Sequence, residues 1–206
     1  MFQELSLNDV LNLTGKNQID AGECHDLQKQ FGSYQCYYCN IQFNQNHFDY
    51  WKEIIKKKNR RGEVVLVIRN HMNQILLHTK SFYPDNTYRL LSGGIDQDEP
   101  VPRALARELF EETGFNSIAQ NMVAFLFYRF SFQDQFLAFP SFIFEIEPDG
   151  SEPQSQDQEE EITNYKWIPY SYLDKVAAHL KSFENEWRDW GRMRAVVHDI
   201  VYQWYL

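Results

Sequence analysis

The chain has 206 residues, 43% of them hydrophobic and 24% charged, so it can bury a core and has the composition of a globular protein. Its formal net charge of −9 argues against a surface that binds nucleic acid or anionic membranes. No apolar run approaches the roughly 18 residues of a membrane span, and residues 1–4 have neither a basic start nor the apolar core of a signal peptide. Three cysteines do not suggest a disulfide framework, so we expect a reducing, cytoplasmic setting.

Residues 1–60 are expected to form an N-terminal extension of helical and irregular structure, packed on the main domain. Ser6 before Leu7–Leu11 predicts a short capped helix, and Phe48–Lys57 predicts another. Four possible zinc ligands lie between them: Cys24, His25, Cys36 and Cys39. Because adjacent ligands are awkward for one tetrahedral ion, we favour ordinary cysteines over a zinc site or a redox pair.

The main domain is expected to span residues 61–180 and to begin with strands. Glu63–Arg69 is rich in β-branched residues and predicts a buried strand. The turn-like residues 70–73 and the apolar Gln74–Lys80 predict that the two strands form a hairpin. Tyr88–Gly94 is expected to lead into a glycine loop. His78 is expected at the surface.

A helix is predicted from Pro102 to Glu112. Proline is tolerated in the first turn of a helix, where its missing N–H would be unpaired in any case. Asp98 and Glu99 place negative charge where the helix dipole favours it, and Thr113-Gly114 provides a C-terminal stop. The expected apolar stripe comprises Ala104, Leu105, Leu109 and Phe110.

Three carboxylates of this helix, those of Glu108, Glu111 and Glu112, fall on one face because they are spaced at i, i+3 and i+4. Like charges so close repel one another unless a cation lies among them. Carboxylate oxygens without nearby His or Cys favour a hard ion such as Mg²⁺ or Mn²⁺. The alternative is a solvated acidic face paired with Arg103 and Arg107.

After this helix, Val123–Phe130 and Phe136–Ile146 predict two long aromatic strands, with a bulge or a sheet edge at Pro140. Residues 148–161 are acidic and poor in apolar side chains, so we expect a mobile loop. Ile162–Ile168 predicts a further strand.

The last segment, residues 181–206, is expected to form an amphipathic helix from about Phe183 to Leu206. Its apolar residues recur at helical spacing; they are Trp190, Met193, Val197, Ile200, Val201 and Trp204. This stripe predicts either packing on the domain or a homodimer interface.

The stretch from Gly93 to Phe115, 23 of the 206 residues, has the pattern Gly-x5-Glu-x7-Arg-Glu-x-x-Glu-Glu-x-Gly. With Leu109 and Phe115 at its two apolar positions, it resembles the signature of the Nudix hydrolases, and every fixed position is filled. The resemblance implies an α/β fold in which a mixed β-sheet is sandwiched between helices. Two departures, Leu91 where proline is frequent and Asp98 where glycine is frequent, remove no carboxylate.

The resemblance also implies roles for particular residues. Glu108, Glu111 and Glu112 match the carboxylates that bind the metal, together with the backbone carbonyl of Ser92. Glu108 or Glu112 is also expected to help orient the attacking water. Arg107 and Glu99 match residues that hold these glutamates in place. The expected catalytic set is therefore Glu108, Glu112, Arg107 and Glu99.

Other residues are weaker candidates because they lie outside the signature. Glu159–Glu161 either supplies a further acidic ligand or general base, in which case Glu160 or Glu161 is favoured, or is a solvated acidic run. Candidates for binding substrate phosphates are Arg69, Lys80, Arg89 and Arg129, and candidates for stacking on a base are Tyr83, Tyr88 and Phe132.

We therefore expect a Mg²⁺- or Mn²⁺-dependent hydrolase that cleaves the pyrophosphate linkage of a nucleoside diphosphate joined to another moiety. ADP-ribose-like compounds, nucleotide sugars and nucleoside triphosphates all fit. The alternative is a catalytically silent protein of the same fold that senses nucleotides or binds a partner. An isoprenoid diphosphate isomerase would need a cysteine beside the metal, and no cysteine follows Cys39.

Overall fold

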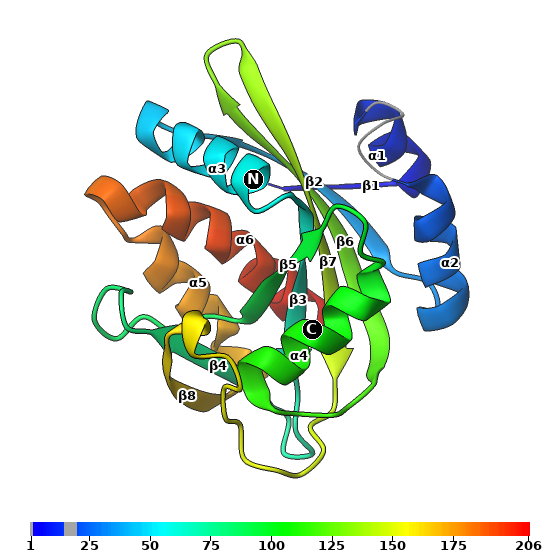
Figure 1. Cartoon of the computed structure of the whole chain (residues 1–206), viewed down its shortest axis with the longest axis vertical. Helices are drawn as coiled ribbons and strands as arrows, with labels where there is room; N and C mark the ends of the chain where they lie inside the picture. The colour runs from blue at the N-terminus through cyan, green and yellow to red at the C-terminus, as the bar shows by residue number, and fades with distance from the viewer. Residues whose placement is uncertain (1, 15–19) are drawn as a thin grey trace.

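The computed structural model describes residues 2–14 and 20–206, and within them one mixed sheet has the strand order β1-β2-β6-β7-β3-β5. Its strands are β1 (Gln3–Leu5), β2 (Gln35–Gln42), β3 (Arg60–Ile68), β5 (Leu91–Asp96), β6 (Ala119–Phe132) and β7 (Gln135–Ile146). The helices are α1 (Leu7–Thr14), α2 (Ala21–Phe31), α3 (Gln45–Lys57), α4 (Val101–Thr113), α5 (Leu173–Lys181) and α6 (Arg188–Trp204). Figure 1 shows α3, α5 and α6 gathered on one side of the sheet, with α4 in front of β3 and β5.

The sheet separates two hydrophobic clusters, as its alternating side chains require. In β3, Val64 and Leu66 face the cluster that contains α1, α2 and α4, whereas Val65 and Val67 face the cluster that contains α3, α5 and α6. The α/β architecture with helices on both faces of a mixed sheet is therefore confirmed.

The predicted hairpin of the two strands around residues 70–73 is wrong. Strand β4 (Gln74–Lys80) instead pairs antiparallel with β8 (Ile162–Pro169) in a separate two-stranded sheet. Strand β8 is the strand predicted at residues 162–168. Only an isolated bridge between Arg69 and Ile75 joins β4 to the end of β3. The hairpin cannot form along β3 because β5 and β7 already occupy its two edges.

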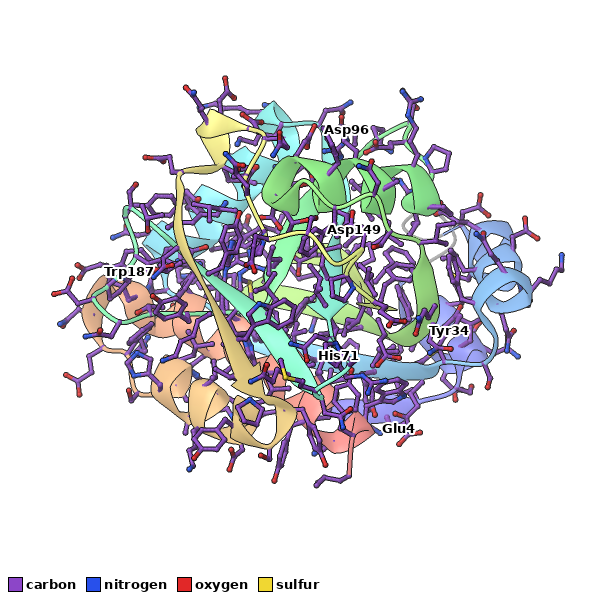
Figure 2. All side chains as sticks on the ribbon, turned by 90° about the horizontal axis from the view of Figure 1, so that it is seen from below. Glu4, Tyr34, His71, Asp96, Asp149 and Trp187 are labelled. Atoms are coloured by element: carbon purple, nitrogen blue, oxygen red, sulfur yellow. The ribbon has the colours of Figure 1, made fainter. Side chains whose placement is uncertain are left out.

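The N-terminal residues contribute directly to the central sheet. Strand β2 pairs in parallel with β6 over its whole length, and β1 adds to the outer edge of β2. Neither strand is predicted from the sequence, whereas α1, which begins after Ser6, and α3 are both predicted. His71 lies exposed in the turn before β4 (Figure 2), but His78 is buried, so its expected surface position is wrong.

The three cysteines are free and buried. Cys24 and Cys36 belong to one hydrophobic cluster and Cys39 to the other, on the opposite face of the sheet. Burial raises the pKa of the Cys24 thiol to about 12 and those of Cys36 and Cys39 to about 11. Their burial, with Cys39 across the sheet from the other two, and their raised thiol pKa values fit the ordinary cysteines that the sequence favours.

The two long aromatic strands are confirmed as β6 and β7. No register shift occurs at Pro140, which pairs with Phe127, so the predicted bulge is absent there. The pairing of β7 with β3 begins one residue later, at Ser141, so Pro140 is unpaired only on that side. Its missing N–H therefore costs no bond with β3.

The C-terminal helix α6 starts at Arg188, later than expected, after a 3₁₀ turn, η3 (Asn185–Trp187). Its apolar stripe packs inside the chain, with Trp204 half-buried at the end, so the stripe gives no support to a homodimer. Gly191 lets α6 approach α5 closely, because a Cβ there would lie 2.2 Å from the Leu180 carbonyl oxygen.

We expect Gly191→Ala to lower the free energy of unfolding by about 1–3 kcal/mol, because the added methyl forces α5 and α6 apart. Urea unfolding followed by circular dichroism measures this loss. The control is Arg192→Ala on the exposed side of the same helix, expected within about 0.5 kcal/mol of the wild type. Equal stability of the two variants would show that the helices do not need the glycine.

Candidate active site

Helix α4 carries most of the signature and ends as predicted. Pro100 precedes it in an extended conformation, and Gly114 ends it in the left-handed region at φ 75°, with its N–H donated to the Phe110 carbonyl. The predicted stripe is wrong at Phe110, whose side chain is 45% exposed. The buried face of α4 includes two glutamates, so two carboxylates lie on the side of the helix that meets the sheet. The residues of this face are Val101, Ala104, Leu105, Glu108, Leu109 and Glu112.

Strand β5 makes room for the first of these carboxylates. Gly93 pairs with Val64 inside the sheet and is not part of a loop, contrary to expectation. A Cβ on Gly93 would lie only 1.8 Å from the carboxyl carbon of Glu108. The glycine is therefore required because the Glu108 carboxylate rests directly on the strand.

Arg107 ties the signature together. Its guanidinium binds Glu99 through two bonds, with Nε to Oε1 at 2.9 Å and Nη2 to Oε2 at 2.7 Å. Nη1 donates to Glu108 at 2.8 Å and to Glu111 at 2.9 Å, and Nη2 donates to the Gly94 carbonyl at 2.9 Å. Hydrogen bonding to Arg107 also lowers the pKa of Glu99. One residue thus fixes the strand, the helix and the loop between them.

Glu112 is the second buried carboxylate, and it is fully enclosed. Among the described residues, neither of its oxygens has a hydrogen-bond partner, and the Lys80 ammonium lies 4.0 Å away. Burial raises the pKa of Glu112 to about 8 and that of Glu108 to about 7, the latter against the opposing effect of Arg107. Two buried oxygens without donors form the kind of site that a divalent cation satisfies, so these residues fit the implied metal.

The carboxylates are nevertheless not gathered into a ready ligand cage. Within residues 2–14 and 20–206, no group of three or more His, Cys, Asp or Glu side chains is placed to hold a metal ion. Arg107 binds Glu108 and Glu111, and Glu111 is only partly buried. Glu111 can therefore join Glu108 and Glu112 around a cation only if its contact with Arg107 loosens.

The loop expected to be mobile, residues 148–161, is anchored on the C-terminal end of α4 (Figure 2, from Asp149 onward). The backbone N–H groups of Gln154 and Gln156 donate to the carbonyls of Thr113 and Glu111 at 2.9 and 2.8 Å. The loop places Glu160 in an ion pair with Lys80, and its charge acts on both Glu108 and Glu112. Glu161 turns away and accepts a bond from Ser81.

Two of the three candidate phosphate-binding residues come to this place. Lys80, from β4, lies between Glu112 and Glu160. Arg89 is buried and donates to Tyr83 Oη at 2.7 Å and to Ser92 Oγ at 2.9 Å, with no carboxylate at ion-pair distance among the described residues. Arg69, in contrast, pairs with Glu145 and Asn73, beyond the end of β3, and is not part of this group.

Several polar residues of this region are not among the candidates from the sequence. His78 is buried beside Arg89, and neither of its ring nitrogens has a partner in the described part of the chain. Tyr165 donates from its hydroxyl to the Glu112 carbonyl. Arg194 and His198 reach the region from α6. A polar residue within an apolar run is a signal for His78 and His198, but it does not indicate which site the residue joins.

The NUDIX domain family matches residues 59–190, which is most of the chain and includes the whole signature. The chain therefore belongs to the Nudix family of hydrolases. A solved structure with a similar arrangement is the MutT protein of Methanosarcina mazei Go1, at 17% identity and a TM-score of 0.44, covering 69% of this chain and 91% of that one. A search of curated proteins finds no match.

Among the described residues, no helix combines the length and the apolarity that a membrane crossing requires.

The raised pKa values predict how a metal affects stability at different pH. In the unfolded chain these glutamates release their protons near pH 4.5, but in the folded chain Glu108 and Glu112 keep them up to about pH 7 and 8. Without metal, the stability that these two residues contribute therefore falls as the pH rises from about 4.5 to about 8. A cation needs the deprotonated forms. We expect Mg²⁺ to raise Tm more at pH 8.5 than at pH 6, in a thermal melt at fixed Mg²⁺ concentration. Equal shifts at the two pH values would contradict this.

Proposed function

We propose that this protein is a pyrophosphohydrolase that depends on Mg²⁺ or Mn²⁺ and cleaves the diphosphate linkage of a nucleoside diphosphate joined to another moiety. The observation that carries the proposal is the buried Glu112 carboxylate beside Glu108 on the same helix face, because neither Glu112 oxygen has a hydrogen-bond partner among residues 2–14 and 20–206. Such a pair is costly to keep charged in the interior of a protein unless a cation joins it.

Glu108, Glu112 and the backbone carbonyl of Ser92 would hold the metal, and Glu111 would join them once Arg107 releases it. The bound cation supplies charge neutralisation on the phosphoryl oxygens and makes a water more acidic. Arg107 and Glu99 keep the helix and β5 in register, since Arg107 contacts both. Arg69 is not included, because its partners lie elsewhere.

Lys80 and Arg89 would bind the phosphate oxygens of the substrate. Arg89 supports this role because a buried guanidinium normally has a carboxylate or phosphate partner. Among the described residues it has no carboxylate at ion-pair distance, and the oxygens that accept its hydrogen bonds, those of Tyr83, Leu90 and Ser92, are neutral. A substrate phosphate would supply the missing negative charge. Glu160, held beside the site by Lys80, is the preferred residue to orient the water or accept its proton.

The predicted effect of Glu112→Gln separates catalysis from folding. Glutamine has the shape of the neutral acid, which Glu112 already adopts below pH 8, so the fold and Tm should be kept. Loss of a metal-binding carboxylate should lower turnover by about 100-fold or more. The matched control, Glu159→Gln in the exposed part of the neighbouring 3₁₀ turn η1 (Gln158–Glu160), should keep wild-type turnover.

Phosphate release, coupled to a phosphatase, measures turnover with Mg²⁺ and then Mn²⁺. The substrate panel comprises ADP-ribose, nucleotide sugars, dinucleotides, dinucleoside polyphosphates and nucleoside triphosphates. Wild-type turnover in Glu112→Gln would contradict the assigned role. Nucleotide binding without cleavage and without metal, seen by calorimetry, would favour a silent sensing protein instead.

A further inference from the structure

The C-terminal helix α6 holds the chain just before the signature strand. The Leu90 N–H donates to His198 Nε2 at 3.0 Å, and His198 Nδ1 lies 2.8 Å from the Arg194 carbonyl. A backbone N–H can only donate, so Nε2 must accept and Nδ1 carries the proton. Burial lowers the pKa of His198 to about 3, which is consistent with this neutral form. The imidazole therefore bridges two backbone segments in one defined tautomer.

Arg194, one turn earlier on α6, reaches the same strand through its side chain. Its Nη1 donates to Glu63 Oε2 at 2.8 Å and to Ser92 Oγ at 3.3 Å. The Ser92 hydroxyl also accepts from Arg89 Nη1 at 2.9 Å. Ser92 thus joins an arginine of α6 to the arginine that we assign to the substrate phosphates.

These contacts act where the sheet provides little support. Strand β5 is the last strand of its sheet, and its pairing with β3 starts only at Leu91. Arg89 is held by an isolated bridge to His78. Between these two points, the Leu90 N–H would be a buried unpaired donor without His198, and such a group costs stability and order. The side chains of α6 therefore fix the segment from Arg89 to Ser92.

We propose that His198 and Arg194 are positioning residues of the active site, which keep Arg89 and the Ser92 carbonyl in place beside Glu108 and Glu112. Nothing about these two residues follows from membership of the family, because both lie beyond residue 190, where the NUDIX match ends. The inference rests on the proposed function, since it assigns meaning to the Ser92 carbonyl and to Arg89. A role in packing alone would predict lower stability without a selective loss of metal binding or turnover.

The test compares two substitutions of His198 with a control on the same helix. His198→Leu removes the acceptor of the Leu90 N–H, whereas His198→Gln restores an acceptor oxygen at similar reach. Asp199→Asn breaks the ion pair of α6 with Lys181, which does not touch the site. For each variant, Mn²⁺ affinity is measured by electron paramagnetic resonance, kcat and KM by phosphate release, and folding by circular dichroism.

We expect His198→Leu to lose about tenfold or more in Mn²⁺ affinity or kcat, the usual effect of removing a residue that orients metal ligands. His198→Gln should recover most of the loss, and Asp199→Asn should match the wild type. If His198→Leu does not fold, Ser92→Ala takes its place, because it removes the shared hydroxyl but keeps the backbone carbonyl. Its Mn²⁺ affinity or kcat should fall in the same direction.

Folded His198→Leu with wild-type Mn²⁺ affinity and kcat would overturn the inference, as would an equal loss in His198→Gln and His198→Leu. When Ser92→Ala is used instead, wild-type values for that variant overturn it. The proposed function fails separately if the wild type turns over no substrate of the panel, and Mn²⁺ affinity then still tests the positioning role. A wild type that binds no Mn²⁺ at all would remove both.

Discussion

The structure depends on two carboxylates buried at the edge strand of the sheet with too few donors to keep both charged. Glu108 lies against Gly93 and shares Arg107 with two other glutamates, and the Glu112 carboxylate has no hydrogen-bond partner in the part of the chain that the structure describes. Burying such groups opposes folding unless something compensates for the lost water. The anchored loop with Glu160, the ammonium of Lys80 and the guanidinium of Arg89 all converge on this place. The cation and the substrate phosphates that we propose for this site would compensate for the cost of this arrangement.

Most of the signature could be predicted from the sequence because its contacts are short in sequence. The helix, its left-handed stop at Gly114 and the shared face of Glu108 and Glu112 all follow from helical spacing. The bond between Arg107 and Glu111 spans one helical turn. The error at Phe110 has the same local origin: the stripe was centred one position too far along, because two glutamates occupy the inner face that apolar residues normally fill.

The parts that could not be predicted depend on pairings between distant segments. Strand β4 pairs with β8 and not with β3, and β2 pairs in parallel with β6. The β-strand propensity of a segment does not indicate which other strand it will pair with. His198 and Leu90 are 108 positions apart, so no local pattern links α6 to the signature. His78 was placed at the surface because a polar residue usually lies there, and its burial beside Arg89 is a tertiary effect.

Diffraction from crystals grown with Mn²⁺, with data collected at the manganese absorption edge, tests the central claim most directly. We predict an anomalous peak between the Glu108 and Glu112 carboxylates, with Glu111 or the Ser92 carbonyl as a further ligand and with the Arg107 contacts to Glu108 and Glu111 loosened. Mn²⁺ bound only to exposed acids such as Glu159, with the Glu112 oxygens still enclosed and unliganded, would contradict it. In that case the buried carboxylates would need a different explanation.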